Sequence, residues 1–229
     1  DDVESRGLGD VYKRQELLSL LMEESKLAPQ HQLPGEEIEG VNVTMQFLRD
    51  ETGQVRYLPR RKVMGYDLDG VIFSMKKAIE CTNQKLGTNL NIETMEAIDY
   101  DLIYYATMDE DIQRKIIRES TPNRKMVEDL AEEHLNGAEI VLITARHVSY
   151  AKETIESLNR FGIYYDKIYF TEEKLPLIIG LDIDWFYDDK PETIAAIKNH
   201  KVRTKAVLVS APYNRGATDY DYRYKVGLE

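Results

Sequence analysis

Short runs of apolar residues, each ended by polar residues, recur along most of this chain. The runs with strand length and nearly continuous hydrophobic character lie at 63–66, 139–143, 164–170, 184–187 and 206–209. Segments with helical periodicity separate the later runs, at about 149–161, 173–179 and 191–199. This alternation predicts a parallel β-sheet covered by helices on both faces. We expect the run at 206–209 to be the final strand.

Polar side chains follow these apolar runs at their carboxyl ends. They are Asp67, Asp69, Thr144, Ala145 with its neighbour Arg146, Lys174, Asp188 and Asp189. In open parallel sheets, ligands bind at the carboxyl ends of the strands, near the point where the strand order reverses. The sequence therefore predicts that these residues meet in one site.

The string DLDG at 67–70 carries two carboxylates two residues apart. Side chains alternate along extended chain, so Asp67 and Asp69 would point the same way, and Gly70 would let the chain turn. The same string is also typical of an ordinary turn. A calcium loop is excluded, because its sixth and twelfth places require Gly and Glu but hold Ile72 and Ala78.

Four short motifs in this order resemble those of the haloacid dehalogenase-like (HAD) superfamily of aspartate-nucleophile phosphatases. They are DLDGV at 67–71, IT at 143–144, Lys174 and DD at 188–189, and the match covers about residues 62–209. The string ITAR at 143–146 and the late PYN at 212–214 are similar to the 5′-(deoxy)ribonucleotidase-like branch. The resemblance implies an α/β fold, a Rossmann-like three-layer sandwich with a central parallel sheet and a small helical cap inserted after the first strand.

The resemblance also implies catalytic roles. Asp67 would attack phosphorus and become an aspartyl-phosphate, while Asp69 would protonate the leaving alcohol and then activate water. This division requires a raised pKa for Asp69 and an ionised Asp67. Thr144 and Lys174 would assist catalysis, and these two residues, with Ala145 and Arg146, would bind the phosphoryl group.

Several carboxylates beside a phosphate require a compensating cation. Mg²⁺ fits, because it prefers one or two carboxylates together with phosphate oxygens and water. We expect Asp67 and Asp188 as direct ligands and Asp189 as a ligand directly or through water, and the family resemblance implies the main-chain carbonyl of Asp69 as a third ligand. Asp188, Asp189 and Thr144 also have purely structural interpretations. The acidic pair would also suit a helix N-terminus, and Thr144 would also suit a helix N-cap.

The stretch from 75 to 137 is longer than a crossover between parallel strands needs. It predicts helices at 75–86, 92–98, 110–118 and 125–135. By the family parallel it is the helical cap, which would close over the site and exclude water. Tyr100, Tyr104 and Tyr105 are candidates for stacking on a nucleobase, although tyrosines at this spacing are also typical of a hydrophobic core.

The domains predicted from these patterns are an N-terminal extension at 1–60, a core at 61–74 and 138–229, and the cap between them. The extension is predicted to contain a helix at 15–26 and a hairpin formed by 41–47 and 55–58. Its opening, to about residue 15, has no hydrophobic periodicity and resembles translated sequencing-adapter read-through, so no element of the fold is predicted there.

Composition narrows the function. The single cysteine, Cys81, favours a reducing compartment, and with no apolar run near 20 residues we expect a cytoplasmic protein without a membrane partner. The net charge of −11 disfavours a long nucleic acid as partner. A magnesium-dependent phosphatase of 5′-nucleotides or similar small phosphomonoesters is the favoured function. The alternatives are a phosphomutase, a nucleic-acid end phosphatase, or a non-catalytic HAD-like binding module.

Overall fold

The computed structural model describes residues 45–49 and 55–226. The chain divides into two compact units, residues 1–60 and 61–229. In the first unit, β1 (Met45–Arg49) pairs antiparallel with β2 (Val55–Pro59), which confirms a hairpin here, with β1 ending two residues and β2 one residue later than predicted. The predicted helix at 15–26 lies outside the described residues.

The second unit is built around a parallel sheet, as the alternating pattern predicted. Its strands, in chain order, are β3 (Val63–Tyr66), β4 (Glu139–Thr144), β5 (Lys167–Phe170), β6 (Trp185–Asp188), β7 (Lys205–Val209) and β8 (Tyr222–Tyr224). In space the order is β5-β4-β3-β6-β7-β8, and all neighbouring pairs are parallel. The chain starts in the middle at β3 and adds strands first on one side and then on the other. The strand order therefore reverses at β3, where ligands bind in such folds.

The prediction that 206–209 is the final strand is wrong. The strand β8 follows and pairs with β7, with Leu208 opposite Arg223. Because β8 is three residues long, lies at the edge of the sheet and carries an arginine at its centre, no apolar run marks it in the sequence.

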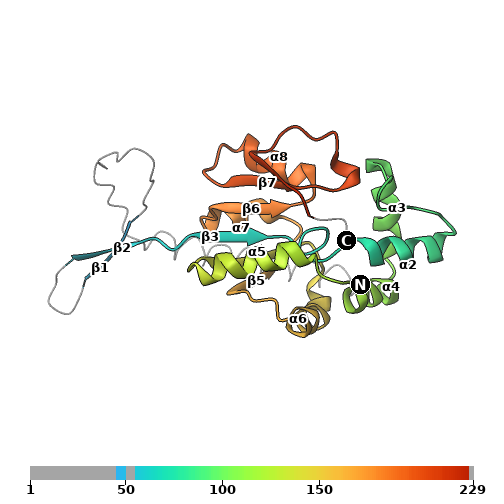
Figure 1. Ribbon diagram of the computed structural model, residues 1–229, viewed down its shortest axis with the longest axis horizontal. Coiled ribbons are helices and arrows are strands. Elements are labelled where there is room, and N and C mark those ends of the chain that lie inside the picture. The colour runs from blue at the N-terminus through green and yellow to red at the C-terminus, as the bar shows by residue number, and fades with distance from the viewer. Residues whose placement is uncertain (1–44, 50–54, 227–229) are drawn as a thin grey trace, which may run out of the picture. The chain divides into compact units, whose positions relative to one another are not determined.

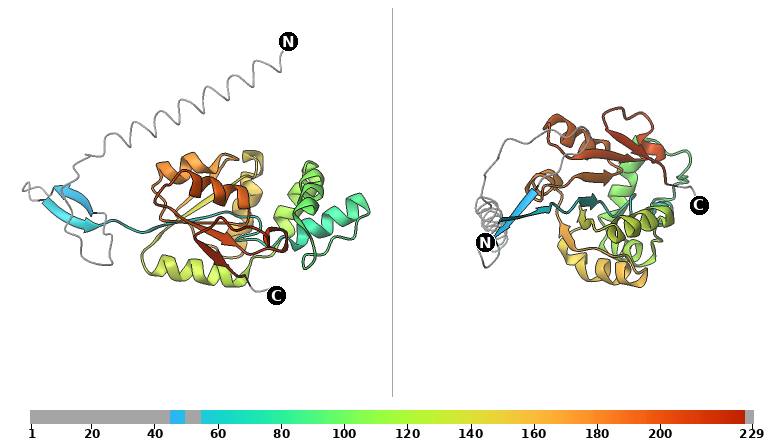
Figure 2. Two further views of the ribbon diagram at one scale, coloured as in Figure 1. Left: turned by 90° about the horizontal axis from the view of Figure 1, so that it is seen from above. Right: turned by 60° about the vertical axis from the view of Figure 1, so that its left-hand side comes forward.

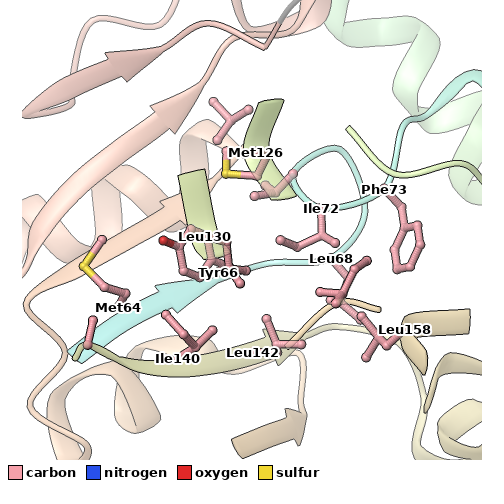
Figure 3. Packing of buried hydrophobic residues seen from close by; sticks show 14 residues of the cluster. Met64, Tyr66, Leu68, Ile72, Phe73, Met126, Leu130, Ile140, Leu142 and Leu158 are labelled. Atoms are coloured by element: carbon pink, nitrogen blue, oxygen red, sulfur yellow. The ribbon is translucent and has the colours of Figure 1, made fainter. Parts of the chain in front are cut away.

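Helices cover both faces of this sheet, which completes three layers (Figures 1 and 2). On one face, α5 (Arg124–Leu135) and α6 (Ala151–Arg160) share a buried apolar cluster with β3 and β4, through Met126, Leu130 and Leu158. Figure 3 shows Leu130 beside Tyr66 of β3 and opposite Leu142 of β4. On the other face, α7 (Lys174–Gly180) and α8 (Pro191–Asn199) contribute to a second cluster. Within the described part of the chain, no helix is both long and apolar enough to cross a membrane.

A third apolar cluster belongs to the helices inserted after β3. These are α2 (Lys76–Leu86), α3 (Ala97–Thr107) and α4 (Glu110–Glu119). Figure 1 shows them gathered at the end of the sheet toward which β3 points. The predicted cap of residues 75–137 thus includes one helix, α5, that packs on the sheet, while α2, α3 and α4 form the group over the strand ends.

The helix predicted at 92–98 is displaced in the structure, where α3 begins at Ala97 and ends at Thr107. The side chain of Asn91 accepts a hydrogen bond of 2.8 Å from the Glu93 N–H and holds a turn there. The helix starts only where Glu96 and Asp99 cap each other reciprocally.

Candidate functional site

The ends of β3 and β6 bring two carboxylates side by side. The strands pair with Tyr66 opposite Tyr187, so the next residue of each, Asp67 and Asp188, lies at the same edge of the sheet. The Asp67 N–H continues the ladder by donating to the Tyr187 carbonyl at 2.9 Å. Both carboxylates are buried. The strand ends therefore hold two acids in a place that ordinarily excludes charge.

The loop after β3 folds back on itself within a few residues. The Gly70 N–H donates to the Phe73 carbonyl at 2.8 Å, and the Phe73 N–H donates to the Leu68 carbonyl at 2.7 Å. Gly70 has φ +80°, a left-handed conformation that side chains disfavour. This turn places Asp69 beside Asp67 at the mouth of the site.

Lys174 is the buried cation that joins the two acids. As the first residue of α7, it extends its Nζ to Asp67 Oδ1 at 2.8 Å and to Asp188 Oδ2 at 2.7 Å. Burial alone would lower the pKa of Lys174, but the two carboxylates outweigh it and raise this pKa above its ordinary value. Lys174 is therefore charged and neutralises part of the site.

A third buried carboxylate, Asp189, completes an acidic cluster. One oxygen from each of Asp67, Asp188 and Asp189 lies within 4.8 Å of the others. Asp189 Oδ1 is buried and, among the described residues, has no hydrogen-bond partner. Burial raises the pKa of Asp67 to about 6 against the effect of Lys174, with help from Asp188. Burial, Asp188 and Asp67 also raise the pKa of Asp189 well above its ordinary value.

These observations fit a metal site. Lys174 alone cannot neutralise three carboxylates. A buried carboxylate oxygen without a hydrogen-bond donor, such as Asp189 Oδ1, is also a potential ligand for a cation. Converging carboxylate oxygens are the donors that Mg²⁺ prefers. Asp188 and Asp189 also lie at a helix N-terminus, because α8 starts two residues after Asp189. This position is compatible with the metal site, so neither interpretation of the acidic pair excludes the other.

Arg146 forms a bidentate salt bridge with Asp69. The Arg146 Nε donates to Asp69 Oδ2 at 2.8 Å and its Nη2 donates to Oδ1 at 2.6 Å. The guanidinium also donates to Thr154 Oγ1 at 3.2 Å and lies 5.3 Å from the centre of the Phe73 ring. This geometry fixes the orientation of Asp69, a role for Arg146 that the sequence did not reveal.

The expected order of the two aspartate pKa values is reversed in the structure. The proposed roles of these residues predicted a raised pKa for Asp69 and an ionised Asp67. Burial would raise the pKa of Asp69, but the charge and hydrogen bonds of Arg146 outweigh it and lower this pKa. Asp67, in contrast, is buried beside other carboxylates and has no bidentate contact with an arginine, so its pKa rises. The expectation for Asp69 does not hold in the free protein, because it took no account of Arg146, whereas Asp67 with a pKa of about 6 is still mostly ionised near neutral pH.

Thr144 ends β4 as a fully buried side chain at the same edge of the sheet. Its Oγ1 accepts a hydrogen bond of 3.2 Å from the Arg146 N–H. The alternative of a helix N-cap is wrong, because His147 caps the following turn by accepting from the Ser149 N–H at 3.3 Å. Thr144, with Ala145 and Arg146 directly after it, therefore belongs to the loop at the site.

Tyr213 and Asn214 support Asp189 from the loop after β7. The Tyr213 hydroxyl donates to Asp189 Oδ2. The Asn214 Nδ2 donates to the carbonyls of Asp189 at 2.7 Å and Val209 at 2.8 Å. The sequence drew attention to PYN at 212–214 only through family resemblance, since nothing local ties these residues to an acid about 25 positions earlier.

Of the three tyrosines expected to stack or pack, Tyr100 alone is directed to the acidic cluster. Its ring lies 5.3 Å from that of Tyr213, and the Lys190 Nζ lies 5.4 Å from its centre. Burial is the main effect that raises the pKa of the Tyr100 hydroxyl, and the negative charges of Asp189 and the other site carboxylates raise it further. Tyr104 and Tyr105 are 63% and 60% exposed, so the interpretation of these two as core residues is wrong.

We expect Gly70→Ala to disrupt the site through a direct clash. An added Cβ would lie 2.1 Å from Asp189 Oδ2. The matched control is Gly87→Ala, which has a similar φ of +65° and nothing within 4 Å of its Cβ. The control should lose about 1–2 kcal/mol of unfolding free energy from backbone strain alone. Chemical denaturation should show a larger loss for Gly70→Ala, and equal losses would contradict the packing described here.

Comparisons with known proteins show which family this chain resembles. The family model described as 5′ nucleotidase, deoxy (pyrimidine), cytosolic type C protein matches residues 61–225. A "putative nucleotidase" of Oceanobacillus iheyensis is 32% identical over 89 residues, covering 37% of this chain and 46% of that protein. A "putative nucleotidase" of Bacillus cereus is 23% identical over 167 residues, covering 66% and 87%. The chain thus spans less than half of the first relative's length.

Solved structures show the same fold. A "putative phosphatase" from Clostridium difficile superposes with a TM-score of 0.50 at 16% identity, covering 74% of this chain and 96% of that chain. A "predicted phosphatase" from Clostridium acetobutylicum gives 0.50 at 14% identity, covering 72% and 94%. With the sheet order, these likenesses confirm the HAD-like α/β fold class.

Proposed function

Because the chain belongs to the 5′ nucleotidase, deoxy (pyrimidine), cytosolic type C family of HAD-like phosphatases, we propose that it hydrolyses 5′-nucleotides or similar small phosphomonoesters through an aspartyl-phosphate, with Mg²⁺ as cofactor. The observation that carries the proposal is the pair of Asp67 and Asp69 beside Lys174 and the acidic cluster. A binding module would need neither a nucleophile nor an acid at these two positions. The family description, together with the single buried cysteine, supports a cytoplasmic location.

Asp67 is the proposed nucleophile. An oxygen of Asp67 forms a bond to phosphorus while the bond from phosphorus to the ester oxygen breaks. The Lys174 ammonium, 2.8 Å from Asp67, holds the carboxylate in place and balances the negative charge of the arriving phosphate. The Thr144 hydroxyl, at the carboxyl end of β4, would donate a hydrogen bond to a phosphoryl oxygen.

Asp69 is the proposed acid and base. It gives a proton to the departing ester oxygen, then takes one from the water that attacks phosphorus and frees Asp67. Its contact with Arg146 keeps it ionised in the free protein. A phosphoryl group competes for the Arg146 guanidinium and adds negative charge beside Asp69, and both effects favour the protonated acid. Arg146 therefore orients Asp69, and its guanidinium would bind phosphate by giving up part of this contact.

Asp67 and Asp188 would hold the Mg²⁺, with Asp189 as a direct or water-mediated third and the Asp69 carbonyl as a family-implied ligand. When bound, the ion supplies positive charge to phosphoryl oxygens. The neighbours Tyr213 and Asn214 keep Asp189 directed toward the cluster.

We expect metal removal to abolish activity. Treatment with EDTA should stop phosphate release, Mg²⁺ should restore it, and Ca²⁺ should inhibit, because its larger and looser coordination suits in-line transfer poorly. The measurement is the initial rate of phosphate release before and after dialysis against chelator. Full activity in EDTA would contradict a metal-dependent mechanism.

A panel of phosphomonoesters tests the substrate class. We expect faster phosphate release from ribo- and deoxyribonucleoside 5′-monophosphates than from their 3′-isomers, sugar phosphates or a 5′-phosphorylated oligonucleotide. Isomerised sugar phosphate without phosphate release would indicate a phosphomutase instead. Preference for the oligonucleotide would indicate a nucleic-acid end phosphatase. If no ester were hydrolysed, the non-catalytic binding module would be the remaining interpretation.

Tyr100 should affect nucleotide substrates selectively. If its ring packs against the leaving group, Tyr100→Leu should lower kcat/KM for a 5′-nucleotide by about ten- to a hundredfold, the scale of base stacking. Activity on p-nitrophenyl phosphate should change little. The exposed Tyr104→Leu serves as the matched control. Equal losses on both substrates, with a lower melting temperature, would show that Tyr100 only supports Tyr213.

A further inference from the structure

A cavity lies on the sheet face that α5 covers, away from the acidic cluster. It has a volume of about 290 Å³, and tyrosines from adjacent parts of the sheet line it: Tyr66, Tyr187 and Tyr224. The rings of Tyr66 and Tyr187 stack at 4.8 Å, and Tyr224 meets Tyr187 edge-on at 5.8 Å. We call this cavity the tyrosine pocket. Its walls present the aromatic faces that attract cations.

Tyr66 reaches the tyrosine pocket with an unsatisfied hydroxyl. The residue is 2% exposed, and its side chain packs beside Leu130 of α5 (Figure 3). Yet none of the hydrogen bonds between described residues involves its hydroxyl, which is open to the pocket. An unpaired hydroxyl that faces a cavity is free to bind a ligand or water there.

The other wall of the tyrosine pocket is acidic. The residues of α5 that line it include Asp129, Glu132 and Glu133. Lysines already occupy part of this wall, since Lys125 bonds Asp129 at 2.7 Å and Lys62 bonds Glu133 at 3.0 Å. Three carboxylates against two ammonium groups leave one negative charge. The pocket therefore favours a positively charged occupant.

The arrangement does not suit a metal ion. Among the residues that the structure describes, the carboxylates close enough together to hold a metal ion are those of Asp67, Asp188 and Asp189. The acids of α5 do not form such a group. Aromatic faces also offer no lone pairs to a hard cation. In contrast, the Lys125 Nζ already lies 5.1 Å from the centre of the Tyr224 ring, which shows that an ammonium group is accommodated there.

We propose that the tyrosine pocket binds a small organic ammonium ion, whose N–H groups donate to the Tyr66 hydroxyl and to the α5 carboxylates while its carbon chain lies against the tyrosine rings. The volume fits a short alkyl diamine. Neighbouring residues connect the pocket to the active site. Tyr66 directly precedes Asp67, Tyr187 directly precedes Asp188, and the Asp67 N–H donates to the Tyr187 carbonyl. An occupant would thus hold the strand ends that carry the two aspartates.

Calorimetry with 1,4-diaminobutane and the full chain tests this proposal. We expect one saturable site with a dissociation constant of about 1 mM or below, which six non-hydrogen atoms can supply. The neutral analogue 1,4-butanediol should not bind. Absence of diamine binding to the wild-type protein would overturn the proposal, and equal binding of the diol would overturn the cationic nature of the ligand.

Two variants locate the binding. Tyr66→Phe keeps the ring and removes the hydroxyl, and it should weaken diamine binding about tenfold, as expected for a hydrogen bond to a charged group. Glu132→Gln should also weaken binding, whereas Glu156→Gln on α6, which makes the same charge change on another exposed glutamate, should not. Because Glu132 is exposed, its variant remains informative even if Tyr66→Phe folds poorly. Binding that is unchanged in Glu132→Gln and in a folded Tyr66→Phe would place the diamine elsewhere and overturn the proposal.

Discussion

Replacing Asp67 with Asn should reduce turnover by about 10⁴-fold or more, the scale that follows loss of a catalytic nucleophile. The amide has nearly the shape of the carboxylate but cannot attack phosphorus. The fold should persist, because Lys174 retains its contact with Asp188 at 2.7 Å. The measurement is kcat for a 5′-nucleotide, with circular dichroism to verify folding.

Asp219→Asn is the matched control, since the same chemical change falls on an exposed side chain. Its kcat should remain within about twofold of wild type, consistent with the small effects of surface substitutions. If Asp67→Asn retained activity close to that of the control, a covalent mechanism through Asp67 would be ruled out.

Replacing Lys174 with Met should destabilise the protein by about 3–5 kcal/mol, the scale seen when one partner of a buried ion pair is removed. Lys174, Asp67 and Asp188 are all nearly inaccessible to solvent, so water does not screen the charges left behind. Activity should be lost as well. Denaturant unfolding measures the free-energy change, and Lys152→Met, whose side chain is 84% exposed, is the control.

Mg²⁺ gives this experiment a second readout. A divalent cation that binds the same carboxylates should restore part of the stability lost in Lys174→Met, by linkage between binding and folding. Wild type should gain less from Mg²⁺, because Lys174 already offsets part of the charge. Equal stabilisation of the two proteins, or an unfolding free energy of the variant equal to that of wild type, would contradict the electrostatic account of the site.

The sequence predicted the framework because its strands are marked by local signals. Val63–Tyr66 and Pro191–Asn199 appear in the structure at the predicted positions, since a continuous apolar run and a proline at a first helical turn need no distant partner. In contrast, β8 is Tyr-Arg-Tyr, which becomes a strand only because β7 offers an open edge. Helix α3 was displaced by side-chain caps at Asn91 and Glu96, whose strength depends on local geometry.

The site was predictable to the extent that the ends of parallel strands meet at one edge. That rule alone placed Asp67, Thr144 and Asp188 together. It could not reveal the contact between Arg146 and Asp69, which spans 77 positions and depends on how two loops fold. This contact lowers the pKa of Asp69 and reverses the expected order, so the electrostatics required the structure.

The most direct test of the account is to look for the phosphorylated enzyme. The protein would be mixed with a 5′-nucleotide and Mg²⁺, quenched in acid during turnover, digested and examined by mass spectrometry. The account predicts a phosphoryl group on the peptide containing Asp67, located to that residue by borohydride reduction, and absent from Asp67→Asn. Sustained phosphate release with no phosphoryl group on Asp67 at any quench time, or with the label on another residue, would contradict it.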